Sequence, residues 1–180
     1  MVQTNYMQVM AEAAQPRNPL FRAGDVPILF QHLPDLIALS EKLLTAFEYH
    51  ASQLWRMFCP AQVGPIFRNL EDDLVVFLRY AMHYQNNIKS IRRACNNVLV
   101  LKIEQETLSQ KDTHRLGIAD YLIAPFQRVP RYCLLIKDLL KHTERCDPNY
   151  KDLDIALKLL TGLVTAMDYV QETHRIKSTF

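Results

Sequence analysis

Glycine is scarce in this chain, where only 4 of 180 residues are glycine. They are Gly24, Gly64, Gly117 and Gly162, so no two of them lie close together in the sequence. A loop that cradles phosphate needs closely spaced glycines, because the backbone must approach the phosphate oxygens. The sequence therefore argues against a P-loop and against a dinucleotide-binding fold.

Motifs of metal-dependent and nucleophilic enzymes are absent as well. The six histidines form no H-E-x-x-H pair, and the chain contains no G-x-S-x-G motif. His142 and Cys146 are four residues apart, but two ligands at a helix end make a poor metal site. We expect no metal, no cofactor and no covalent chemistry on a small substrate.

The sequence also lacks paired cysteines and long apolar runs. Cys59, Cys95, Cys133 and Cys146 are too widely spaced for a C-x-x-C motif, and no secretory signal is recognisable, which favours reduced thiols in a cytoplasmic protein. The longest apolar runs, such as LVVFL, fall far short of the roughly 20 residues that cross a bilayer. We therefore expect no transmembrane segment and no direct membrane insertion.

An excess of charge of one sign is missing too. The chain has 21 basic and 19 acidic residues, giving a net charge of +2, which does not indicate a nucleic-acid partner. One local cluster, KSIRRA with Arg92 and Arg93, could contact phosphate or acidic lipid. Solvated helix faces carry such clusters routinely, and that is the simpler interpretation.

Helical periodicity, by contrast, runs through most of the chain. Residues 1–14 look like the tail of a helix that begins upstream and that the prolines of QPRNP end. We therefore expect the chain to be a fragment. Residues 23–58 predict one helix or two, with Asp25 as a candidate N-cap and Pro34 as a start or kink. Residues 65–100 predict helix with a break near HYQNN.

The remaining segments complete an all-α prediction. VLVLKI alone could be a strand, but a lone strand would have no sheet to join, so we assign helix. Asp147 and Pro148 form an N-cap followed by proline at the first helical position, and the last helix should run nearly to Phe180. With no repeat and no linker, a single elongated helical bundle is the simplest architecture.

The stretch from Tyr121 to Thr143 predicts a helix that contains two prolines, Pro125 and Pro130, and has two distinct faces. We call one face the core seam; at 100° per residue it comprises Leu122, Phe126, Val129, Cys133, Ile136 and Leu140. We call the opposite face the outer stripe: Asp120, Ala124, Gln127, Arg131, Leu134 and Asp138, with Ile123 beside them. The outer stripe is either covered in the bundle or forms a protein-binding surface, whose composition it matches.

These residues carry a resemblance to a known family. LIAPFQRVPRYCLLIKDLLKHT resembles the third conserved region of Dbl homology (RhoGEF) domains, roughly L-I-x-P-x-Q-R-[VIL]-x-[KR]-Y-x-L-L-L-x-x-L-L-K-x-T. GPIFRNLEDDLVVFLRYAMHYQNN is similar to the segment leading into the second region. VPILFQHLPDLIALSEKLLTAFE and NYM are similar to parts of the first.

The resemblance implies an elongated bundle of about six helices that acts as a guanine nucleotide exchange factor for a Rho-family small GTPase of the Rho, Rac or Cdc42 type. In that family both proline positions belong to the helix that docks on the GTPase. The GTPase-binding positions carried over to this chain are Gln3, His114, Asp120, Ile123, Ala124, Gln127, Arg131, Leu134 and Asp168. Arg131 would face the GTPase switch II region.

Two positions depart from the family's pattern. Gln3 stands where the family has a glutamate that engages switch I, and Asp168 stands where asparagine is common. We expect residues 1–180 to be one such domain, with the start of its first helix missing and without the pleckstrin homology domain that commonly follows. The alternatives are an impaired module that binds a GTPase without releasing nucleotide, and a helical adaptor of similar architecture only.

Overall fold

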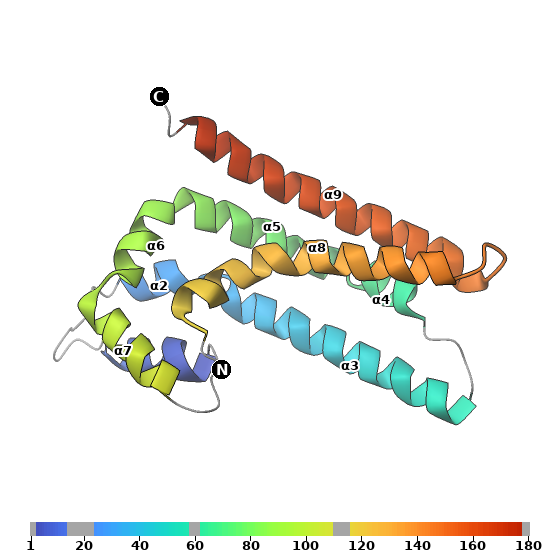
Figure 1. Ribbon diagram of the computed structural model, residues 1–180, viewed down its shortest axis with the longest axis horizontal. Coiled ribbons are helices and arrows are strands. Elements are labelled where there is room, and N and C mark those ends of the chain that lie inside the picture. Colours follow the sequence, from blue (N-terminus) through green and yellow to red (C-terminus); the bar gives the residue numbers. More distant parts are fainter. Residues whose placement is uncertain (1–2, 14–23, 58–61, 110–115, 178–180) are drawn as a thin grey trace. The chain divides into compact units, whose positions relative to one another are not determined.

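The computed structural model describes residues 3–13, 24–57, 62–109 and 116–177. Their elements are a π-helix, η1 (Gln3–Gln8), and the α-helices α1 (Val9–Ala13), α2 (Asp25–Phe30), α3 (Leu33–Met57), α4 (Val63–Asn69), α5 (Glu71–Asn86), α6 (Ile88–Cys95), α7 (Val98–Ser109), α8 (Ile118–His142) and α9 (Pro148–Lys177) (Figure 1). No strand occurs within these ranges, which confirms the all-α prediction. The predicted QPRNP helix stop lies outside them.

The pieces outnumber the expected six helices because short breaks interrupt the predicted ones. Within the predicted stretch 23–58, α2 and α3 are separate helices, and His32 between them has a left-handed φ of 66°. The predicted N-cap at Asp25 is wrong, because Asp25 is the first helical residue and Gly24 occupies the cap position. Pro34 follows Leu33, the first residue of α3, so the predicted start there is confirmed.

Other predicted helix boundaries agree with the structure. The expected break near HYQNN lies at Asn87, and VLVLKI begins α7 rather than a strand. Asp147 Oδ1 accepts a hydrogen bond from the Asn149 backbone N–H at 2.7 Å, which confirms Asp147 as the cap of α9. No helix in the described ranges combines the length and hydropathy needed to cross a bilayer.

The chain divides into two compact units, and α5 and α8 contribute to both. Unit 1 comprises Met1–Gln31 and His83–Pro125. Its buried side chains include Tyr6, Met10, Leu29, Ile91, Val100, Ile118 and Leu122. Within it, α2 is tied to the end of α5, because the His83 ring donates from Nε2 to the Ile28 carbonyl oxygen at 2.8 Å.

Unit 2 comprises His32–Met82 and Phe126–Phe180. Its buried side chains include Leu36, Leu39, Leu43, Phe67, Leu74, Phe77, Tyr80, Val129, Ile136, Leu153, Leu160 and Met167. The Phe67 ring of α4 lies 6.0 Å from that of Phe47 in α3 and 5.3 Å from that of Tyr132 in α8. Aromatic side chains therefore join three helices of this unit.

The short helix α4 packs closely on the start of α9 (Figure 1). Arg68 of α4 forms an ion pair with Asp152 of α9. Gly64 makes the approach possible, because a Cβ at this position would lie 2.5 Å from the Asp152 carbonyl carbon and 2.6 Å from the Leu153 nitrogen. Only a residue without a side chain fits against that backbone.

We predict that Gly64→Ala lowers the free energy of unfolding by about 1 to 3 kcal/mol, because the added methyl forces two packed backbones apart. Chemical denaturation followed by circular dichroism would measure the change.

Gly162→Ala is the matched control. Gly162 is exposed within α9, and an added Cβ there would meet no atom within 4 Å. Alanine should therefore stabilise the protein by about 0.5 to 1 kcal/mol through helix propensity. If Gly64→Ala raised the free energy of unfolding as Gly162→Ala is expected to do, the close approach at Gly64 would be contradicted.

Candidate functional site

The outer stripe of α8 begins in unit 1, where it is exposed. Asp120, Ile123 and Ala124 all face solvent, and the Ile123 side chain is 38% exposed. Leu122, on the core seam, is only 1% exposed. The predicted division between a buried and an open face therefore holds at this end of the helix.

The part of the outer stripe that belongs to unit 2 is exposed as well. Gln127, Arg131 and Leu134 face solvent, and Leu134 is 66% exposed although it is apolar. Of the core seam, Val129 and Ile136 are buried, whereas Phe126, Cys133 and Leu140 are half-buried. The alternative expectation, that α8 is covered nearly all round, is wrong for these positions.

The two arginines of this helix have different environments. Arg128 donates from Nε to the Tyr132 hydroxyl at 2.9 Å, and its guanidinium carbon lies 5.0 Å from the centre of the Tyr132 ring. Arg131 donates only a long bond, 3.4 Å from Nη2 to Gln127 Oε1, and forms no ion pair with any carboxylate in the described ranges. Arg128 is used within the fold, and Arg131 presents its charge to solvent.

Asp120 has a local role at the start of α8. Its Oδ2 accepts a hydrogen bond from the Gly117 backbone N–H at 2.9 Å, and Glu104 Oε1 of α7 accepts one from the Ile118 N–H at 2.8 Å. Two carboxylates thus satisfy backbone donors at a helix N-terminus, where negative charge is favourable. Sequence reasoning missed Glu104, because its partner lies 14 residues away and no local pattern links them.

Tyr6, the tyrosine of NYM, anchors the N-terminal helix within unit 1. It is fully buried, its ring lies 5.8 Å from that of Tyr121, and its hydroxyl donates to the Leu116 carbonyl oxygen at 3.4 Å. Burial raises the pKa of Tyr6 to about 12, and the nearby charge of Glu104 adds to the rise. The tyrosine therefore stays neutral in the folded protein at ordinary pH.

Asp168 of α9 lies close to the second proline of α8. It lines a shallow hollow in unit 2 together with Phe126, Pro130, Val164, Met167 and Gln171. Its side chain is exposed and forms no ion pair with a described residue. Pro130 lines the same hollow as Asp168 and directly precedes Arg131. Asp168 therefore lies near the unit 2 part of the outer stripe.

Two predicted site residues receive little structural description. Gln3 begins η1, but its side chain is outside the described part of the structure. His114 lies outside the described residues altogether. Their assignment continues to rest on the family resemblance.

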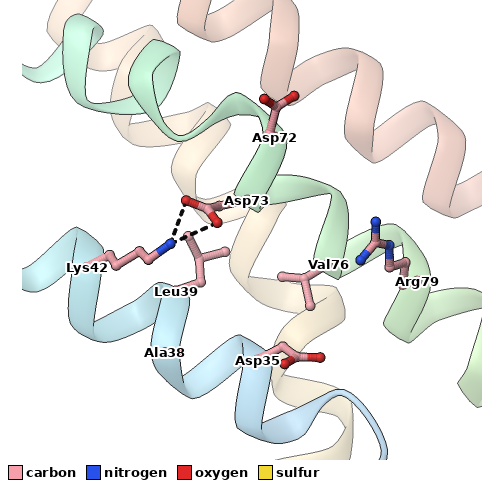
Figure 2. Close-up of a pocket in the computed structure, with 8 residues that line it drawn as sticks. All are labelled: Asp35, Ala38, Leu39, Lys42, Asp72, Asp73, Val76 and Arg79. Carbon is pink, nitrogen blue, oxygen red and sulfur yellow. Dashed lines mark hydrogen bonds and ion pairs between the residues drawn. The ribbon is translucent and has the colours of Figure 1, made fainter.

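A larger hollow of about 270 Å³ lies elsewhere in unit 2, between α3 and α5 (Figure 2). Lys42 of α3 crosses one side of it and bonds both carboxylate oxygens of Asp73 at 2.9 Å. Asp35, Asp72 and Arg79 also line it, but no predicted site residue does. The hollow is therefore distinct from the outer stripe.

The described residues offer little for metal binding, and Cys95 and Cys133 offer little for thiol chemistry. Among them, no group of three or more His, Cys, Asp or Glu side chains could hold a metal ion. Burial raises the pKa of the Cys95 thiol to about 11, with Glu104 contributing, and burial also raises the pKa of Cys133. Both thiols are therefore protonated, and poor nucleophiles, at neutral pH.

Comparison with solved structures identifies the fold. A structure of Vav1 bound to an allosteric inhibitor matches 97% of this chain and 30% of its own with a TM-score of 0.80 at 20% identity. The PDZ-RhoGEF DH/PH domains in complex with activated RhoA match 97% of this chain and 48% of their own with a TM-score of 0.74 at 18% identity. The chain has the fold of an all-α DH domain.

Comparison of sequences establishes the family. The profile of the RhoGEF domain matches residues 1–168. The guanine exchange factor for Rac 30 of Dictyostelium discoideum is 33% identical over 114 residues, 63% of this chain and 7% of that protein. The human proto-oncogene DBL is 30% identical over 161 residues, 81% of this chain and 17% of that protein. The chain belongs to the RhoGEF domain family and spans less than a fifth of either relative.

The raised pKa of Tyr6 predicts a loss of stability at alkaline pH. Because the folded state holds the phenol proton more tightly than the unfolded chain, the contribution of Tyr6 is complete below its ordinary pKa of 10.0 and is lost as the pH rises through about 12. Tyr6→Phe should remove that part of the decline, at the expense of one hydrogen bond near neutral pH. The free energy of unfolding of both proteins, measured between pH 10.0 and about 12, tests this prediction.

Tyr169→Phe serves as the control, because Tyr169 is 70% exposed. It should leave the alkaline decline unchanged. If Tyr6→Phe and the unmodified protein lost the same amount of stability as the pH rises, Tyr6 would not be a source of the alkaline decline.

Proposed function

We propose that this chain is an exchange domain that binds the switch regions of a Rho-family small GTPase and promotes release of GDP. The observation that carries the proposal is the exposed outer stripe, with Arg131 free of any described carboxylate partner, in a chain of the RhoGEF family. No covalent chemistry is required. The GTPase itself binds the nucleotide, and the exchange domain changes how tightly it does so.

The mechanism follows from linked binding equilibria. If the domain binds the nucleotide-free GTPase more tightly than the loaded form, it must weaken nucleotide binding by the same factor. Contacts at the switch regions would achieve this by disturbing the magnesium and phosphate sites of the GTPase. The surface therefore needs exposed anchors that the fold itself does not use.

In unit 2, Arg131 is the principal anchor of the proposal. Its planar guanidinium can bind two acceptors on switch II, and Gln127, 3.4 Å away, helps to orient it. Leu134 adds an exposed apolar contact, 66% accessible. Asp168 adds an acceptor from α9. An apolar centre with arginine and other polar residues around it is typical of protein interfaces.

In unit 1, the proposal assigns Asp120, Ile123 and Ala124 to the same kind of contact. Asp120 uses one carboxylate oxygen to cap Gly117, and a carboxylate has further acceptor capacity for a partner. Gln3 and His114 are assigned by resemblance alone.

The relatives support a Rho-family partner without choosing one. One relative is named as an exchange factor for Rac, and one structural neighbour is a complex with RhoA. The proposal therefore covers GTPases of the Rho, Rac and Cdc42 types.

The alternative proposal is a GTPase-binding module with little exchange activity. Gln3 is neutral where the family has a glutamate, and Asp168 cannot donate a hydrogen bond as an asparagine would. Binding to a nucleotide-free GTPase without faster nucleotide release would favour this alternative. If the chain neither bound a nucleotide-free GTPase nor accelerated nucleotide release, the helical adaptor would be favoured.

We predict that Arg131→Ala lowers exchange, or GTPase affinity where exchange is slow, by about thirtyfold, because loss of a central anchor costs about 2 kcal/mol or more. Arg131→Glu should be worse, since it adds repulsion. Release of a fluorescent nucleotide from Rho, Rac and Cdc42 type GTPases would measure the effect.

Arg128→Ala provides the internal control. Arg128 contacts Tyr132 through a hydrogen bond and a cation–π interaction, so its loss should reduce stability by about 1 kcal/mol. Arg131→Ala should leave the melting temperature unchanged. If Arg131→Ala unfolded the protein, or if it folded and exchanged normally, Arg131 would not be the anchor.

We also predict that Gln3→Glu accelerates exchange, because the carboxylate would gain the cationic partner on switch I that the resemblance implies. The same release assay, beside Gln8→Glu as a control for added charge, tests it. An equal response to the two substitutions would argue against a special role for position 3.

A further inference from the structure

Helix α6 presents a purely cationic face. Ile91 and Ala94 are buried at 3% exposure each, whereas Lys89, Arg92 and Arg93 are exposed on the other side of the helix. The three cations occur at positions i, i+3 and i+4, so they share one face. The sequence of α6, IKSIRRAC, contains no acidic residue.

The next helix along the chain exposes apolar side chains at its start. Helices α6 and α7 belong to unit 1 and follow each other along the chain, joined by Asn96 and Asn97 (Figure 1). At the start of α7, Val98 is 78% exposed and Leu101 is 47% exposed, and the exposed Lys102 follows. We call Lys89, Arg92, Arg93, Val98, Leu101 and Lys102 the α6–α7 face.

The cations of the α6–α7 face are exposed, and among them Arg92 lies near enough to Tyr84 to oppose the rise that burial causes in the pKa of this tyrosine. None of the four cations of this face forms an ion pair with a described residue. Of the two acids of α7, Glu104 accepts a hydrogen bond from the Ile118 N–H, and Glu106 is exposed. Val98 is the most exposed of the large apolar side chains in the described ranges.

We propose that the α6–α7 face docks unit 1 on an anionic lipid surface. Lys89, Arg92, Arg93 and Lys102 complement lipid phosphates, while Val98 and Leu101 reach the boundary between headgroups and acyl chains. This shallow contact departs from the sequence-based expectation of no membrane insertion. Cations combined with exposed aliphatic groups are typical of segments that lie on a membrane without crossing it. An acidic protein segment would use the cations but would leave two aliphatic side chains in water, so the lipid is favoured.

The test is co-sedimentation with phosphatidylserine-containing vesicles, using pure phosphatidylcholine vesicles as the neutral comparison, at about 0.1 M salt. R92Q/R93Q should lower the partition coefficient about thirtyfold, because each cation near an anionic surface contributes about fivefold. V98S/L101S should also weaken binding, at unchanged charge. Circular dichroism melts show that each variant is folded.

R145Q/K151Q is the matched control, because both residues are exposed in unit 2 and the same two charges are removed. It should change the partition coefficient less than about twofold, because neither residue belongs to the α6–α7 face. An equal loss in the two charge variants would overturn the proposal, and so would failure of the unmodified chain to bind the anionic vesicles.

Two further outcomes would assign the face to another partner and reject the lipid. One is binding to soluble polyglutamate that depends on Arg92 and Arg93 but ignores V98S/L101S. The other is a dimer in sedimentation velocity, without vesicles, that R92Q/R93Q dissociates.

Discussion

The burial of one face of α8 is the constraint on which the described structure depends most. Ile118 and Leu122 are core residues of unit 1, and Val129 and Ile136 are core residues of unit 2, each with no more than 1% of its surface exposed. A single helix thus contributes buried side chains to the cores of both units. Its rotation about its own axis is fixed by these contacts, and that rotation leaves the outer stripe exposed in each unit.

The fold was largely predictable because most of it is set by periodicity and capping. Asp147 and Pro148 specified the start of α9, and the confirmed hydrogen bond is between residues two apart. The left-handed His32 and the Gly64 contact were not predictable, since each depends on packing between segments. The prediction of Asp25 as the N-cap was wrong because residue propensity alone does not fix a helix boundary to one residue.

The candidate site was likewise predictable only in part. Periodicity predicted that Arg131 and Leu134 lie opposite the core seam, and both are exposed. Periodicity could not separate Arg131 from Arg128, because the difference lies in the ring of Tyr132 against which Arg128 packs. The proposed roles of Gln3 and Asp168 came from family resemblance, since no physical pattern in one sequence identifies the residue that a GTPase contacts.

The prolines of α8 are compatible with this division of labour. A proline removes one backbone donor and crowds the preceding turn, at about 3 kcal/mol in a helix that is not adapted to it. Here Pro125 is buried and Pro130 is half-buried against α9 residues such as Met167, so both rings contribute packing in return. Arg131 is then presented by a helix held through its neighbours Val129, Pro130 and Tyr132. Binding strength at this position can therefore change without loss of the core, because the groups that fix the helix are not those that the proposed partner would contact.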